Sequence, residues 1–224
     1  GVTWRSKIMP LKFLDARGTG YTSDAIAAIL YADQMGARII SNSWGGISSQ
    51  ALRDAIESSS AVVICAAGNT GANADISPVY PAAYPSGNII SVAATDPRDQ
   101  LASFSNYGSS TVDLAAPGVQ IYSTAPGGRY KFMNGTSMAT PYVSGVAALI
   151  ASQSSSLTAD QIKSRILNGC DRMGTLSGKV ATGGRLNAAK ALGVTTPVPT
   201  PVNTITPTRT PTPDPTPSNT IPPP

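Results

Sequence analysis

The most constraining feature of the chain is the run of residues 61–66, Ala-Val-Val-Ile-Cys-Ala, in which every residue is apolar. A strand with one buried face alternates apolar and polar residues, whereas a strand covered on both faces is apolar throughout. Runs of this kind are typical of parallel sheets that carry helices on both sides. The run therefore predicts the centre of an α/β sheet.

The segments around this run alternate between helix and strand patterns. The expected strands are 7–13, 38–42, 61–66, 88–92, 112–114, 119–122 and 129–132. The expected helices are 23–36, 50–58, 137–152, 158–167 and 187–192. Ser23 or Asp24 is expected to cap the first helix, and Thr158 with Gln161 has the pattern of a capping box. Three strand–helix–strand repeats predict a three-layer, doubly wound, mostly parallel sheet with right-handed crossovers.

The last part of the chain, residues 195–224, has a different composition. Eleven of the 19 prolines lie there and alternate with threonine. Such a segment cannot bury a core and is expected to be extended and polyproline-like. We interpret residues 1–194 as a domain and 195–224 as a spacer to a further domain, the alternative being a disordered tail. Because the chain begins with Gly1, it is expected to lie within a longer protein.

Composition excludes several classes of function. The net charge is +4, but the 16 Lys and Arg residues are scattered, so nucleic acid is not an expected partner. No stretch reaches the roughly 18 apolar residues of a membrane span. The low charged content of 12% is common in secreted proteins, and we expect a secreted or extracellular location.

The two cysteines cannot form a disulfide framework. Cys65 lies in the apolar run and is interpreted as a small buried hydrophobe, with a single bridge to Cys170 as the alternative. A catalytic thiol would need a nearby base or positive charge, and the sequence shows none beside either cysteine.

The segment 134–141, Asn-Gly-Thr-Ser-Met-Ala-Thr-Pro, places Ser137 at the start of an apolar, Ala-rich helix. Free N–H groups and the helix dipole favour negative charge there, which suits a nucleophile and the oxyanion it creates. The loop 66–71, Ala-Ala-Gly-Asn-Thr-Gly, offers the Asn69 amide as a second donor, and Gly68 allows close approach. Taken alone, each residue has an ordinary alternative: an N-cap serine and a turn asparagine.

Four segments together, 41–46, 66–69, 91–96 and 134–141, resemble the subtilisin family of serine proteases, and the similarity covers about residues 1–193. The resemblance implies a subtilisin-like fold and hydrolysis of peptide bonds in proteins through an acyl-enzyme. It implies that Ser137 is the nucleophile and that the side chain of Asn69 belongs to the oxyanion hole. Other residues are implied to pair with the substrate backbone beside the primary specificity pocket, near whose floor the stretch 79–81 lies: Ser43, Trp44, Gly45, Ala66, Ala67 and Gly68.

No organic cofactor is implied by the resemblance. Family members often bind calcium as a structural ion, and Asp75 with nearby loop carbonyls is a candidate to contribute oxygens. No spacing of ligands identifies a metal site, so the metal-binding residues stay unassigned.

One departure from the family is serious, because the chain contains no histidine at all. The family aspartate and histidine precede the region that Gly1 matches, and Asp15, Asp24 and Asp54 do not match that aspartate. We therefore expect the N-terminal part of the domain to be missing from these residues and the chain alone to be inactive. The alternative is a degenerate, non-catalytic member of the family that acts as a peptide-binding or surface-interaction module.

Overall fold

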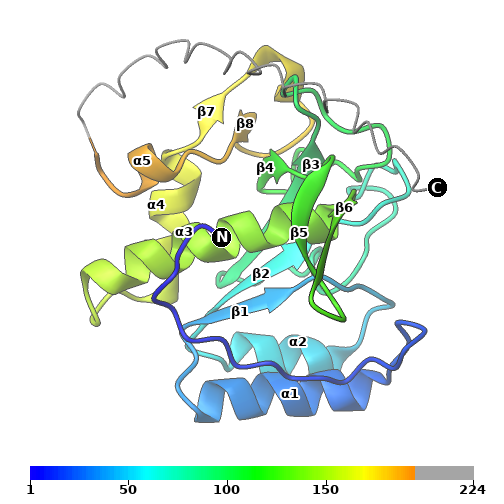
Figure 1. Ribbon diagram of the computed structural model, residues 1–224, viewed down its shortest axis with the longest axis vertical. Helices are drawn as coiled ribbons and strands as arrows, with labels where there is room; N and C mark the ends of the chain where they lie inside the picture. The colour runs from blue at the N-terminus through cyan, green and yellow to red at the C-terminus, as the bar shows by residue number, and fades with distance from the viewer. Residues whose placement is uncertain (195–224) are drawn as a thin grey trace, which may run out of the picture.

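A six-stranded sheet separates two layers of helices in the computed structural model, which describes residues 1–194 (Figure 1). The strand order is β1-β2-β3-β4-β8-β7, with β7 antiparallel to β8 and every other neighbouring pair parallel. The strands are β1 (Ile39–Asn42), β2 (Val62–Ala66), β3 (Ile89–Thr95), β4 (Leu114–Pro117), β7 (Asp171–Arg172) and β8 (Gly184–Arg185). The predicted three-layer, mostly parallel α/β architecture is confirmed.

The helices lie on both faces of this sheet, as Figure 1 shows. They are α1 (Thr22–Gln34), α2 (Gln50–Glu57), α3 (Thr136–Gln153), α4 (Ala159–Asn168) and α5 (Ala188–Ala191), with a short 3-10 turn η1 (Gly174–Leu176). The helices α1 and α2 cover one face, and α3 and α4 cover the other. Within residues 1–194, no helix combines the length and the apolar character needed to cross a membrane.

The strand β2 explains why both layers are needed. Val62 and Ile64 pack into the apolar cluster with α3 and α4, whereas Val63 and Cys65 pack into the cluster with α1 and α2. All four side chains are fully buried. Alternate residues of a strand point to opposite faces, so a strand between two helical layers must be apolar at every position.

The expected strand at residues 7–13 is wrong. The segment forms no ladder with any described strand, and Ile8 is 88% exposed. A short apolar run forms a strand only where an adjacent strand pairs with its backbone. The local sequence does not show whether such a strand is present. Two parallel pairs of the described sheet are connected through helices, β1–β2 through α2 and β4–β8 through α3 and α4, whereas β2–β3 and β3–β4 are joined by irregular loops.

The helix-start predictions had mixed outcomes. Thr158 and Gln161 form the expected capping box of α4. The N-cap position of α1 is Tyr21, which makes no side-chain cap, so Ser23 and Asp24 lie inside the first turn. Asp24 lies near the positive end of the helix dipole. An acidic residue is favoured there as well as at an N-cap, so the sequence does not distinguish the two positions.

Two of the expected short strands form a hairpin outside the main sheet, β5 (Ile121–Ala125) and β6 (Arg129–Met133). Gly127 and Gly128 make its turn with positive φ angles of 81° and 69°. The hairpin is mostly exposed, and β6 leads directly into the start of α3. It therefore brings the chain to the segment that carries Ser137.

Both cysteines are free and buried, so the alternative of a Cys65–Cys170 bridge is wrong. Burial raises the pKa of the Cys65 thiol to about 12 and that of the Cys170 thiol to about 11. Since the thiolate is the reactive form, neither residue is suited to nucleophilic chemistry.

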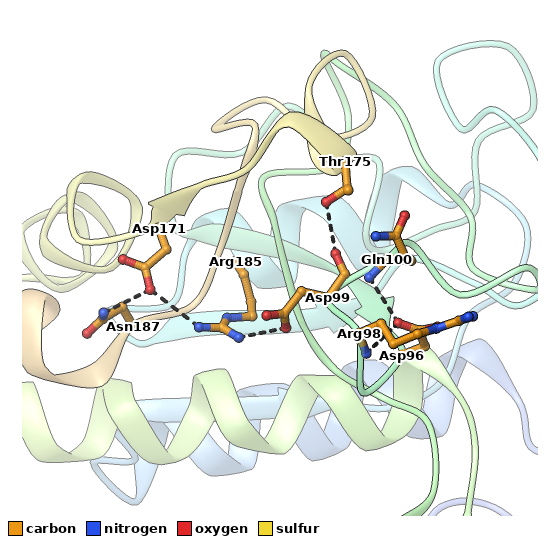
Figure 2. Close-up of polar contacts among 8 residues, drawn as sticks. All are labelled: Asp96, Arg98, Asp99, Gln100, Asp171, Thr175, Arg185 and Asn187. Carbon is orange, nitrogen blue, oxygen red and sulfur yellow. Dashed lines mark hydrogen bonds and ion pairs between the residues drawn. The ribbon is translucent and has the colours of Figure 1, made fainter. Parts of the chain in front are cut away.

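A polar network stabilises the edge of the sheet formed by β8 and β7 (Figure 2). Arg185 contacts Asp99 Oδ1 at 2.6 Å and Asp171 Oδ2 at 3.4 Å, which joins β8 to β7 and to the loop after β3. Asp171 also accepts from Asn187 Nδ2 at 3.0 Å and Lys190 Nζ at 2.6 Å. Burial acts to raise the pKa of Asp171, but these hydrogen bonds and the adjacent positive charges outweigh it and hold that pKa below its usual range.

We predict that Asp171→Asn lowers the free energy of unfolding at neutral pH by about 1–2 kcal/mol, because the charged hydrogen bonds are lost. A depressed carboxyl pKa contributes stability that is complete above the unfolded value of 3.8 and is lost as the pH falls through the folded value. The difference between variant and wild type in urea titrations should therefore shrink as the pH falls below 3.8. Asp54→Asn, at an exposed position, is the control. A difference that persists at low pH would contradict the assignment.

We also predict that iodoacetamide at about pH 8 leaves Cys65 and Cys170 unmodified in the folded protein, because both thiols are buried and protonated. Both should react after unfolding in guanidinium, and peptide mass spectrometry measures the two states. Rapid alkylation of the Cys65 peptide under native conditions would show that β2 is not packed as described.

Candidate functional site

Ser137 lies in the first turn of α3, where the chain comes out of the β5–β6 hairpin. Its hydroxyl donates to the carbonyl oxygen of Ser43 at 3.1 Å. The Ser43 hydroxyl in turn donates to the carbonyl oxygen of Ser137 at 3.0 Å. This reciprocal pair joins the start of α3 to the loop that follows β1.

Asn69 lies in the loop after β2 and contacts the residue directly before Ser137. Its Oδ1 accepts from the backbone N–H of Thr136 at 2.8 Å and from Thr136 Oγ1 at 3.0 Å. Thr136 is fully buried, and its Oγ1 also accepts from the N–H of Gly68 at 3.2 Å. The carbonyl end of the Asn69 side chain is therefore held by α3, which leaves the amide end, Nδ2, to point elsewhere.

The free amide of Asn69 and the N–H of Ser137 border the same small space. A Cβ atom placed on Gly135 would lie 3.7 Å from Asn69 Nδ2 and 3.6 Å from the backbone nitrogen of Ser137. No side chain occupies that point, because residue 135 is glycine. The structure thus brings Ser137 and Asn69 together around this point, which the sulfur of Met138 also borders at 3.6 Å.

The residues expected to bind substrate lie at the carboxyl ends of two adjacent strands. Ser43, Trp44 and Gly45 follow β1, while Ala67 and Gly68 follow β2, which ends at Ala66. Because β1 and β2 pair in parallel, these two segments emerge from the same edge of the sheet. The side chains of Ala66 and Ala67 are buried, so what this part of the chain can offer a ligand is backbone.

The stretch 79–81 borders these segments. Tyr80 and Gly46 form an antiparallel bridge through two backbone hydrogen bonds of 2.7 and 3.1 Å. A Cβ on Gly45 would lie 2.6 Å from Val79 Cγ1, so only glycine fits at that approach. Trp44 is half-buried and packs edge-to-face on Phe13, with 5.1 Å between ring centroids.

Sequence reasoning assigned no role to two buried residues of the site, Thr136 and Asn106. Thr136 orients the Asn69 side chain, and Asn106 binds the backbone of the same loop. Thr136 directly precedes Ser137 in the segment 134–141, and this position is a sequence signal for it. Asn106 stands in a polar loop and had no sequence signal, because only the fold shows that it is fully buried.

No described residue serves as a base for the Ser137 hydroxyl, whose hydrogen-bond partner in residues 1–194 is a backbone carbonyl. The same residues contain no group of three His, Cys, Asp or Glu side chains that could hold a metal ion. At Asp75, Oδ1 accepts from Thr111 N at 2.9 Å and Thr111 Oγ1 at 2.7 Å. A calcium ion there would have to displace these donors, and calcium binding stays a prediction.

Comparisons with known proteins match the arrangement to one family. The model of the subtilase family matches residues 1–193. Thermitase of Thermoactinomyces vulgaris is 43% identical over 86% of this chain and 67% of its own length, and subtilisin DY of Bacillus licheniformis is 39% identical over 78% and 64%. The chain thus spans about two thirds of these relatives.

Solved structures agree with this result. A protease of Pseudoalteromonas arctica superposes with a TM-score of 0.76 at 30% identity, covering 86% of this chain and 64% of that one. A cold-adapted subtilisin-like serine proteinase gives a TM-score of 0.69 at 34% identity, over 76% of this chain and 64% of its own. On the family match, the identities and the common fold, the chain belongs to the subtilase family.

Proposed function

We propose that these residues form the nucleophile and oxyanion side of a serine endopeptidase site that cleaves peptide bonds in proteins. The observation that carries the proposal is the anchoring of Asn69 Oδ1 on Thr136, which leaves Asn69 Nδ2 free beside the N–H of Ser137. An acyl-transfer enzyme needs such a pair of fixed donors where negative charge develops.

In this proposal Ser137 Oγ attacks the substrate carbonyl carbon, and its proton passes to a base. The carbonyl oxygen becomes an oxyanion that accepts hydrogen bonds from Asn69 Nδ2 and from the N–H of Ser137. The tetrahedral intermediate then collapses to an acyl-enzyme, the amine leaves with a proton, and water releases the acid by the same path. The segments at 43–45 and 66–68 would hold the substrate backbone as an added strand. No organic cofactor takes part.

We propose that the base comes from polypeptide outside the 224 residues, because the family resemblance implies a histidine and these residues contain none. The position of β1 supports a further segment beside it. The strand lies at the edge of the described sheet. An added strand at this edge would also cover exposed backbone, which is otherwise a site of aggregation. We infer an extracellular location from family membership and the 12% charged content.

A non-catalytic, peptide-binding module is the second candidate. It is favoured by the resting hydrogen bond from Ser137 Oγ to the carbonyl of Ser43, which occupies the hydroxyl with a group that cannot act as a base. The two candidates differ in one respect: only the peptidase requires Ser137 to become nucleophilic when a base is supplied.

We predict that a fluorophosphonate probe labels this chain weakly on its own. Labelling of Ser137 should rise by about 10⁴-fold or more when the part of thermitase that the chain does not match is fused to it or added to it, because a base then becomes available. Intact-mass spectrometry gives the rate, circular dichroism verifies folding, and Ser137→Ala is the control. Strong labelling of the chain alone would refute the need for an external base. A folded hybrid that stays unlabelled would favour the binding module.

In the labelled hybrid, Asn69→Ala should slow labelling by about 10²–10³-fold, since one of two oxyanion donors is removed. Asn73→Ala is a suitable control, because Asn73 is an asparagine of the same loop that caps its own turn through the N–H of Asp75. Equal rates for the Asn69 variant and the parent would remove Asn69 from the proposed oxyanion hole.

A further inference from the structure

We infer that Asn106 is a positioning residue, which holds the loop 66–72 so that Asn69 stays in place beside Ser137. The inference rests on the proposed function and deepens it. Asn106 lies in the irregular connection between β3 and β4 and is 0% exposed. Burying a side-chain amide is unfavourable unless its donors and acceptor are hydrogen-bonded. The partners of Asn106 therefore show which part of the chain it stabilises.

All side-chain partners of Asn106 belong to the loop that carries Asn69. Oδ1 accepts from Thr70 N at 3.0 Å, from Thr70 Oγ1 at 2.9 Å and from Ala72 N at 3.1 Å. Nδ2 donates to the carbonyl oxygen of Ala67 at 3.0 Å. These bonds hold the backbone on both sides of Asn69. They satisfy backbone groups that have no strand partner in this loop.

The main chain adds a further contact, since the N–H of Asn106 donates to the carbonyl oxygen of Gly68 at 3.0 Å. Gly68 has a φ of +110°, and a Cβ there would collide with Asn106 Nδ2. A glycine at 68 therefore lets the buried amide reach the loop. Asn69 is therefore held in two ways: Thr136 binds its side chain, and Asn106 binds the residues on either side of it.

Only an amide can make this set of contacts. Asn106→Asp keeps the acceptors but turns an oxygen toward the carbonyl of Ala67, while Asn106→Ala leaves three loop donors and one carbonyl without partners. Asn106→Ser is a milder change that keeps one hydroxyl. In each case the expected consequence is displacement of Asn69 Nδ2, and small misplacements of a catalytic group are costly.

The test uses the fused hybrid described above with a peptide substrate. Asn106→Ala and Asn106→Ser should lower kcat by about 10–100-fold with KM nearly unchanged, because Asn106 acts on the transition state through Asn69. Once Asn69 is replaced by alanine, the same changes should cost less than about 3-fold, since the group they position is gone. Additive losses in the double variants would show a general structural role and overturn the inference.

Asn88 offers a matched control, because its Nδ2 donates to the carbonyls of Ile56, Ser59 and Ala61, away from the site. Asn88→Ala should destabilise the protein without changing kcat in the folded fraction, whereas a kcat loss equal to that of Asn106→Ala would count against positioning. Hydrogen exchange on the unfused chain gives a second readout: Asn106→Ala should speed exchange at Thr70 and Ala72 by at least about 10-fold. Unchanged exchange there overturns the inference, whereas an inactive wild-type hybrid overturns the proposed function and the catalytic part of this inference with it.

Discussion

The structure depends first on the burial of β2 on both faces. Val62 and Ile64 pack against α3 and α4. Val63 and Cys65 pack against α1 and α2, so one strand contacts both helical layers. Its parallel pairing with β1 then brings the loops after both strands to one edge of the sheet. The segments that carry Asn69 and Ser43 are neighbours for that reason, although 26 positions separate the two residues in the printed sequence.

A second constraint is the orientation of the Asn69 side chain. An asparagine side chain has an acceptor end and a donor end, and its chemistry depends on which end faces the ligand. Thr136 donates two hydrogen bonds to the acceptor end, and the Asn106 side chain makes three hydrogen bonds to the surrounding backbone and one to the Thr70 hydroxyl. In the proposed function the donor end is then fixed before substrate binds, which is the preorganisation that electrostatic catalysis requires.

The sequence was sufficient where the signal is local or repeats along the chain. The capping box at Thr158 is an interaction within one helical turn, and the apolar run at 61–66 shows two-sided burial through its own composition. The strand expected at 7–13, the two-residue strands β7 and β8 and the role of Asn106 depend instead on distant partners. Packing of the whole domain decides which strand lies at a sheet edge, which strands pair and which polar side chain is buried. Short sequence patterns do not contain this information.

A crystal structure of the phosphonylated hybrid most directly tests whether the oxyanion formed at Ser137 accepts hydrogen bonds from both Asn69 and the N–H of Ser137. The account predicts a phosphonyl oxygen about 2.7–3.1 Å from both Asn69 Nδ2 and the backbone nitrogen of Ser137, with Asn69 Oδ1 still on Thr136. An adduct whose oxygens point away from Asn69, or an Asn69 side chain released from Thr136, would contradict it.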